Sequence, residues 1–267
     1  MKNIWTITWR ELKTYFVSPI AYVVSALFLV AMGYLFALIL VSTRDASLGP
    51  LFSNMIFVLL IMAPALTMKS LAEEQRMGTI ELLLTAPVHD WQVVLGKFLG
   101  SFILFVVMLL APTLYYVLIL QVFGPPDYGP LLTGYLGFLL IGAAYLSIGV
   151  FASSLTQNQV IAFFVGMVIL LLLWIADASS SVFGAGALSD ALTYLALPRH
   201  FSDSFRGIVD TTDIVYAFSI VGIFLFLATQ VLQTRRWRYC ARNFTNGQIT
   251  LPPSPLRSGS RQVSCSC

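Results

Sequence analysis

A short run of polar residues stands out in a chain that is otherwise mostly apolar. Residues 73–81 read EEQRMGTIE and hold three of the four glutamates of the 267-residue sequence, with one arginine and one glycine. Carboxylates and an arginine form charge-assisted hydrogen bonds with groups on a second protein, and a glycine permits a break in the backbone. The pattern indicates either a docking element or an ordinary solvated connector, and composition alone does not favour one interpretation over the other.

The composition around this run is that of a membrane protein. Apolar residues make up 58% of the chain and charged residues 10%, against roughly 45–50% and about 25% in soluble domains. A helix needs about 20 predominantly apolar residues to cross a bilayer, and the runs found here are too continuous for barrel strands. We therefore expect an all-α membrane protein with six transmembrane helices, at residues 20–41, 51–68, 98–123, 131–153, 160–176 and 214–233.

The distribution of basic residues predicts the orientation. Twelve of the fifteen lysines and arginines fall before the first span, between the second and third spans, or after the sixth. By the positive-inside rule, both termini and the segment at residues 69–90 are cytoplasmic. We expect a multi-pass protein of the bacterial inner membrane, whose first span is a retained anchor. The net charge of +3 reflects this topology and requires no nucleic-acid partner.

The N-terminal residues 3–16 form an amphipathic pattern. Trp5 and Trp9 share one face of the expected helix, and Arg10 and Lys13 share another. Large aromatic residues beside basic ones suit a helix that lies in the headgroup layer. The alternative is a solvated leader with chance aromatics.

The outer connection and the C-terminal tail indicate less about function than the segments above. In the outer connection at residues 177–213 we expect short helices, one of them ended by Pro198, which cannot continue a helix. One membrane domain covers residues 1–242, and a Pro- and Ser-rich tail, residues 243–267, is expected to be disordered. The three cysteines are expected to be reduced thiols in an inert tail, with a metal site as the weaker alternative: Cys240, Cys265 and Cys267.

Two features that the sequence lacks restrict the classes of function to consider. The six spans as drawn contain no Asp, Glu, Lys, Arg or His, which disfavours an ion-driven carrier, a haem protein and an intramembrane protease. The only Gly-Lys pair, Gly96-Lys97, is followed by Phe98 and lacks the earlier glycine of a phosphate-binding loop. If this protein moves something uphill, a soluble partner must hydrolyse the ATP.

The polar run also has a predicted local structure. We expect the second span to continue to a break at Gly78, after which Thr79 caps a short helix that Pro87 stops. Such a helix can place charged side chains against a soluble protein while its leucines face the membrane domain.

The sequence EEQRMGTIELLLTAPVHDWQVVLGKFLGSF resembles the cytoplasmic loop of ABC-2 type transporter permeases. Two further stretches, ELKTYFVSPIAYVV and FRGIVDTTDIVYAFSIVGIFLFLATQVLQTRRW, resemble the gliding-motility type within that family. The resemblance covers residues 1–240. It implies a type V exporter-like architecture with an N-terminal interfacial helix, a second permease chain, and two copies of a cytoplasmic ABC ATPase. ATP and Mg²⁺ would bind that ATPase, and no cofactor would bind this chain.

The resemblance also implies roles for individual positions. The ATPase-facing coupling residues would be Glu73, Glu74, Arg76, Gly78, Thr79 and Glu81. The substrate path, lined in the family by the second and fifth spans, would include Asn54, Phe57, Phe163 and Phe164.

We therefore expect a permease subunit that is not itself an enzyme. It would couple ATP hydrolysis on the partner to export of an apolar or amphipathic substrate. The alternative is an ATPase-coupled membrane scaffold that translocates no solute. An ion-driven carrier is the third and weakest hypothesis.

Overall fold

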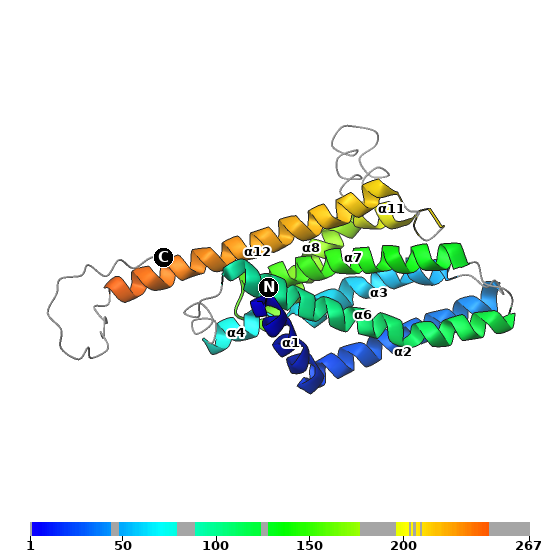
Figure 1. The fold of residues 1–267 in the computed structure, drawn as a ribbon, viewed down its shortest axis with the longest axis horizontal. Coiled ribbons are helices and arrows are strands. Elements are labelled where there is room, and N and C mark those ends of the chain that lie inside the picture. The colour runs from blue at the N-terminus through cyan, green and yellow to red at the C-terminus, as the bar shows by residue number, and fades with distance from the viewer. Residues whose placement is uncertain are drawn as a thin grey trace.

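The computed structural model describes residues 2–43, 48–78, 89–123, 128–176, 196–202, 204, 207–208 and 210–245 of the chain. Within these ranges the secondary structure is helical, and Figure 1 shows an elongated helical bundle. The helices are α1 (Lys2–Val17), α2 (Pro19–Thr43), α3 (Gly49–Thr67), α4 (Ala72–Met77), α6 (Asp90–Phe123), α7 (Tyr128–Leu155), α8 (Gln159–Ile175), α11 (Leu197–Ser202) and α12 (Thr211–Thr245).

Five of the helical stretches in the described ranges are long and apolar enough to cross a membrane. They are Pro19–Ser42, Gly49–Met77, Asp90–Pro112, Gly129–Leu155 and Thr211–Thr234. The expected fifth span corresponds to α8, which begins where Asn158 caps the Val160 amide at 3.0 Å and has 17 residues. At about 1.5 Å per residue, such a helix covers about 25 Å of a hydrocarbon core about 30 Å thick. The structure thus supports five spans by length, and α8 is a shorter apolar helix.

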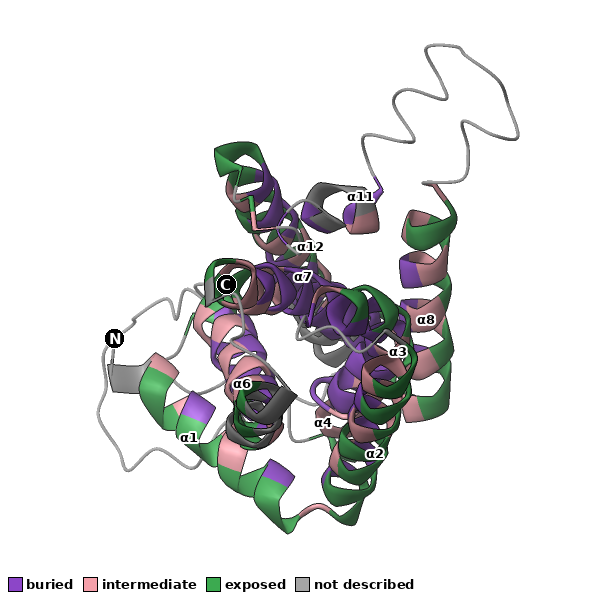
Figure 2. Cartoon of the chain, turned by 90° about the vertical axis from the view of Figure 1, so that its right-hand side faces the viewer, coloured by how far each residue is buried: buried purple, intermediate pink, exposed green. Residues whose placement is uncertain are grey.

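Helix α7 lies at the centre of the bundle. It contacts α3, α6, α8 and α12, and Figure 2 shows its surface as the most buried part of the molecule. Phe138 of α7 packs against Phe52 of α3 and Phe105 of α6, with ring centroids 5.6 and 5.8 Å apart. Glycine allows this approach, because a Cβ at Gly142 would overlap the Phe105 ring.

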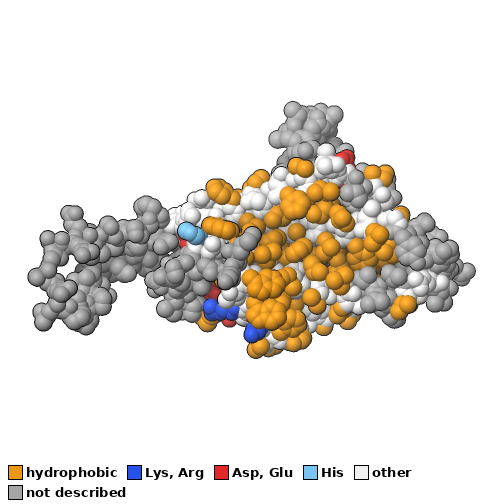
Figure 3. Space-filling view, viewed as in Figure 1, with side chains coloured by type: hydrophobic (Ala, Val, Ile, Leu, Met, Phe, Trp, Pro, Cys, Tyr) orange, Lys and Arg blue, Asp and Glu red, His pale blue; other side chains and the backbone are white. Residues whose placement is uncertain are grey.

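The polar segments gather at one end of the bundle. Figure 1 places α1, α4 and the C-terminal part of α12 there, and we call it the α4 end. Figure 3 shows hydrophobic side chains in a broad band over the middle of the molecule, with charged side chains toward its ends. An exposed apolar band flanked by polar ends is the surface expected of a bilayer-spanning bundle.

Several boundaries differ from the sequence-based expectations. Helix α6 begins at Asp90, eight residues before the expected span at residue 98, because the helix continues beyond the apolar run. Pro198 does not end a helix: it lies in the first turn of α11, where the missing amide of proline costs no hydrogen bond. Helix α12 continues to Thr245 and so includes the first residues of the expected tail. The short helix at residues 79–86, most of the outer connection and the tail from 246 lie outside the described residues.

Candidate coupling site

The end of α3 is joined to α4 through a turn that α7 holds in place. The Ser153 hydroxyl of α7 accepts hydrogen bonds from the Leu71 and Ala72 amides, each at 3.0 Å, and donates to the Met68 carbonyl at 3.1 Å. One buried hydroxyl thus bonds one carbonyl at the end of α3 and two amides at the start of α4, where backbone groups lack partners within a helix. This contact makes the direction of α4 depend on α7.

A second contact fixes α4 on the same neighbour. The Gln75 side-chain amide donates to the Ser154 carbonyl at 3.0 Å, and Gln75 is buried. Helix α4 ends at Met77, and Gly78 follows with φ of 70°, in the left-handed conformation that terminates many helices. The expected break at Gly78 is therefore present.

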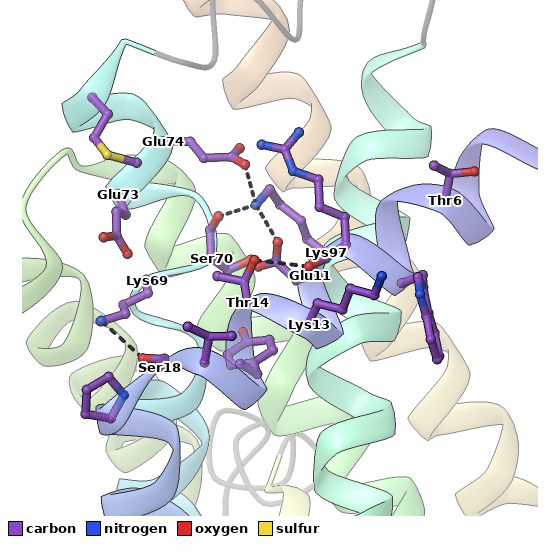
Figure 4. A pocket seen from close by; sticks show the side chains of 16 residues that line it. Thr6, Glu11, Lys13, Thr14, Ser18, Lys69, Ser70, Glu73, Glu74 and Lys97 are labelled. Atoms are coloured by element: carbon purple, nitrogen blue, oxygen red, sulfur yellow. Dashed lines mark hydrogen bonds and ion pairs between the residues drawn. The ribbon is translucent and has the colours of Figure 1, made fainter.

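A buried ion cluster connects this junction to α6 and α1. Lys97 of α6 is 2% exposed, and its Nζ lies 3.0 Å from Glu74 Oε1 of α4 and 3.1 Å from Glu11 Oε2 of α1. Its third donor binds the Ser70 carbonyl at 2.5 Å. Figure 4 shows these groups converging on the Lys97 ammonium. All three hydrogens of that ammonium can therefore be used, which is the condition for burying it.

Two carboxylates share one cation in this cluster. Burial raises the pKa of Glu11 above its ordinary value, because the charged form loses solvation. The attraction of Lys97 acts in the opposite direction and does not offset burial, and the neighbouring Glu74 carboxylate adds to the rise. The cluster is thus sensitive to pH, since its net charge depends on the protonation of Glu11.

Helix α1 is docked across the bundle by polar contacts. In Figure 2 the central helix α7 is seen nearly end-on, whereas α1 lies lengthwise beside α6. The Thr8 hydroxyl donates to the Gly96 carbonyl at 3.2 Å, and the Tyr15 hydroxyl donates to the Leu66 carbonyl at 3.1 Å. Together with the Glu11–Lys97 pair, these bonds attach one face of α1 to α3 and α6.

The predicted coupling residues occupy different environments. Glu74 is paired internally with Lys97, whereas Arg76 is exposed and Glu73 is partly exposed. Gly78 closes α4, and the predicted Thr79 and Glu81 lie outside the described residues. Facing a partner therefore remains a prediction for these positions, and Glu74 has a structural partner within its own chain.

The predicted interfacial residues are all exposed. Trp5 and Trp9 are 64% and 51% exposed, and Arg10 and Lys13 also face outward. The Lys13 ammonium lies 5.7 Å from the centre of the Trp9 ring, within the range of a cation–π contact. The placement of α1 in the headgroup layer stays a prediction.

The four predicted path residues lie on two helices that contact each other, at different depths. Phe57 of α3 is 5.8 Å from Trp174, near the end of α8. Further along, a Cβ at Gly166 of α8 would meet Pro64 of α3, so Phe163 and Phe164 lie nearer the α4 end than Asn54 and Phe57. Phe57 and Phe164 are about half exposed, and Asn54 bonds the Pro50 carbonyl of its own helix at 2.7 Å.

Sequence reasoning missed Glu11, Lys97 and Ser153. Hydrophobic periodicity does not reveal the docked face of α1, because that face carries Thr8, Glu11 and Tyr15. The available signal was chemical: the fourth glutamate stands alone in the N-terminal helix, and one lysine directly adjoins the third apolar run. Buried charges are paired in folded proteins.

The polar contacts of the site join helices to one another. Lys97 and Glu74 join the two helices that flank residues 79–88, and the same ammonium holds α1. Among the described residues, no group of three or more His, Cys, Asp or Glu side chains could hold a metal ion. The Lys97 cluster and the Ser153 hydroxyl thus connect α1, the α3–α4 junction, α6 and α7 at the α4 end.

The fold and site define a multi-pass helical membrane protein whose polar contacts concentrate at one end. Residues 5–193 match the family described as ABC-2 family transporter protein. The chain therefore belongs to the ABC-2 transporter family, whose members are membrane components of transporters. No curated protein matches the chain.

Proposed function

We propose that this protein is the permease subunit of an ATP-driven ABC-2 transporter and works with a separate cytoplasmic ATPase. The observation that supports the proposal most directly is that the two helices on either side of residues 79–88 are joined to each other and to the bundle. The Lys97–Glu74 pair joins its two flanking helices, and Ser153 and Gln75 attach α4 to the bundle centre. A partner that moves this connection acts on the whole bundle.

The proposed topology has six spans, with α8 as the fifth. Two features favour this assignment over five spans. Helix α8 runs alongside α7 and α3, and α1 and the C-terminal part of α12 lie at the same end of the bundle (Figure 1), as expected for an even number of crossings. In this topology the α4 end and both termini are cytoplasmic, in the inner membrane of a bacterium.

The proposed mechanism is alternating access or extrusion. Closure of two ATPase subunits would displace the coupling connection of each of two permease chains, and the bundle would change between two packed states. The exposed face of α3 and α8 carries Asn54, Phe57 and Phe164, and its polar residues in α3 are Ser53 and Asn54. A path with few polar groups suits an apolar or amphipathic substrate. Transport rather than scaffolding is thus the function we favour.

The test uses the chain with a candidate ATPase from the neighbouring reading frames of its genome. We expect the two to co-purify, and we expect Glu81→Ala and Arg76→Ala to lower the ATP turnover of the complex severalfold. Arg44→Ala, in a connection expected on the opposite side, is the matched control and should leave turnover unchanged.

Two results would count against the proposal. Failure to co-purify, together with unchanged turnover for Glu81→Ala, would remove the coupling role. Normal ATP turnover in liposomes with no substrate that stimulates it or moves would favour the scaffold.

A further inference from the structure

A pocket of about 790 Å³ opens at the α4 end between α1, the α3–α4 junction and the start of α6. Figure 4 shows it bounded by Lys13 and Thr14 on one side and by Lys69 and Glu73 on the other. The volume lies within the range of about 300–1,000 Å³ that is common for small-molecule sites. Apart from the Lys97 cluster and Glu73, the polar groups of this pocket have no part in the coupling role.

The charge of the pocket favours an anion. The Lys97 ammonium is already shared between Glu11 and Glu74. Three further basic side chains, Arg10, Lys13 and Lys69, line the same space with one further carboxylate, Glu73. Within the described part of the chain, the Lys69 ammonium makes a long polar contact of 3.4 Å to the Ser18 hydroxyl. A phosphate oxygen would bind more strongly than that hydroxyl, because hydrogen bonds between ionised groups are the stronger kind.

A buried hydroxyl points to a missing acceptor or donor. Ser70 lines the pocket and is 2% exposed, and its Oγ has no hydrogen-bond partner among the described residues. Leaving such a group without a hydrogen bond destabilises the folded state. A polar ligand in the pocket would satisfy it.

The rim of the pocket is apolar on the side of α2. Val17 is 82% exposed, and Trp9 and Pro19 also line the opening. The outward face of α2 continues this surface through Val23, Leu27 and Val30, each more than half exposed. A ligand with a charged head and long apolar chains would therefore find both of its parts accommodated.

We propose that this pocket binds the headgroup of an anionic glycerophospholipid. Lys13 and Lys69 hold the phosphodiester, the Ser70 hydroxyl binds a headgroup oxygen, and the acyl chains follow the exposed face of α2. This site rests on the predicted placement of α1 in the headgroup layer and on the topology given under the proposed function, but it requires no ATPase. A bound lipid would contact both α1 and the α3–α4 junction and so stabilise their arrangement.

The experiment measures lipid binding to the full-length chain purified alone in detergent. Thermal midpoints are recorded with phosphatidylglycerol and with phosphatidylcholine, and retained lipid is identified by native mass spectrometry. We expect preferential retention of phosphatidylglycerol. Lys13→Gln and Lys69→Gln should each weaken its apparent affinity roughly five-fold, from the loss of one cation near an anionic headgroup.

Arg76→Gln is the matched control, because it removes a basic side chain at the same end of the bundle but outside the pocket. It should retain phosphatidylglycerol as the unsubstituted chain does. Equal retention of the two lipids, or an equal loss in Arg76→Gln, would overturn the proposal in favour of diffuse surface charge. The midpoint in phosphatidylcholine shows whether each variant is folded, and if one lysine variant is unfolded the other still tests the proposal.

Two soluble probes separate the possible sources of the phosphate. Inorganic phosphate and glycerophosphoglycerol carry the same chemistry without acyl chains, and we expect little stabilisation from either. Stabilisation equal to that of the lipid would show a free-anion site and would overturn the lipid assignment. Absence of lipid binding in a chain that couples to its ATPase would refute this inference alone. Lipid binding in a chain that does not couple to an ATPase would refute only the proposed function.

Discussion

Lys97 of α6 contacts α1, α4 and the α3–α4 junction through one side chain. Its ammonium is 2% exposed and contacts two carboxylates and one carbonyl. In such a cluster the loss of one member costs more than the loss of all, because an unpaired buried charge is the expensive state. The cluster therefore stabilises one arrangement of α1, α4 and α6 and penalises others.

Lys97→Met should strongly destabilise the protein, since it leaves Glu11 and Glu74 facing each other without a cation. The expected cost is about 3–5 kcal/mol in the free energy of unfolding, as for other broken buried pairs. The thermal midpoint in detergent measures it. The triple variant Glu11→Gln, Glu74→Gln, Lys97→Met should recover much of the loss, and a triple variant as unstable as Lys97→Met would contradict the account.

Glu11 should impose a pH dependence on stability. Its pKa in the folded chain is raised above the ordinary 4.5, so the folded chain binds this proton more tightly than the unfolded chain does. The unsubstituted protein should lose stability relative to Glu11→Gln as the pH rises from 4.5 through the folded-state pKa, with a constant difference above it. Thermal midpoints of both proteins across this range measure the effect, and parallel curves would show that Glu11 is not the group responsible.

Helix α1 is docked by close backbone approach as well as by charge. It crosses α6 where Gly96 and Gly100 leave room, and a Cβ on these residues would lie 2.8 Å from Ile7 Cγ2 and 2.9 Å from Glu11 Cβ. Small residues four apart permit such approach between membrane helices. The junction of α3 and α4 depends instead on a hydroxyl, that of Ser153.

Gly100→Ala should loosen α1, because the added methyl group meets the Cβ of Glu11, which cannot move without the helix. Overpacking of this kind costs about 1–3 kcal/mol. The thermal midpoint and the protease sensitivity of the N-terminal segment measure it. Gly222→Ala in α12 is the control, because a Cβ there meets nothing within 4 Å among the described residues; an equal loss in both variants would exclude steric displacement of α1.

Ser153→Ala should weaken the α3–α4 junction. It removes the acceptor of two buried amides and the donor to Met68, at a cost of about 1–3 kcal/mol per unsatisfied group. Hydrogen exchange of the amides at residues 71–77 should become faster. Ser147→Ala in the same helix is the matched control, because the buried Ser147 hydroxyl bonds the Ala144 carbonyl of its own helix, and similar exchange in the two variants would contradict the capping role.

The molecule as a whole concentrates its polar contacts at the α4 end and presents an apolar surface along its length (Figure 3). The proposed transporter needs this division, because the bilayer accepts the apolar band and a soluble partner can reach only a polar end. The orientation and the crossing of α8 are the two features on which the proposed topology depends.

Cysteine labelling of intact cells tests that topology. In a variant with the native cysteines replaced by serine, Met77→Cys should be protected from an impermeant thiol reagent and Gly129→Cys should react. Tags on both termini should be protected from externally added protease if α8 crosses the membrane. A C-terminal tag cleaved from outside, with the N-terminal tag protected, would show an odd number of crossings and exclude α8 as a span.

Much of this architecture follows from the chain alone. Apolar run length predicts the spanning helices, because a bilayer requires both length and satisfied backbone groups. The break at Gly78 follows from the local freedom of glycine, which no distant residue has to provide. The polar run at residues 73–81 was also recognisable, because charge is rare in this sequence.

The pairing within that run was not predictable. Nothing in the local sequence distinguishes Glu74, which is paired with Lys97, from Glu73, which lines the pocket. The choice depends on how α1 crosses α6 and on where α7 presents Ser153, and these contacts join residues about 80 positions apart. Apolar content and backbone preference act locally and can be read along the chain, whereas charge pairing acts only between groups that folding has already brought together.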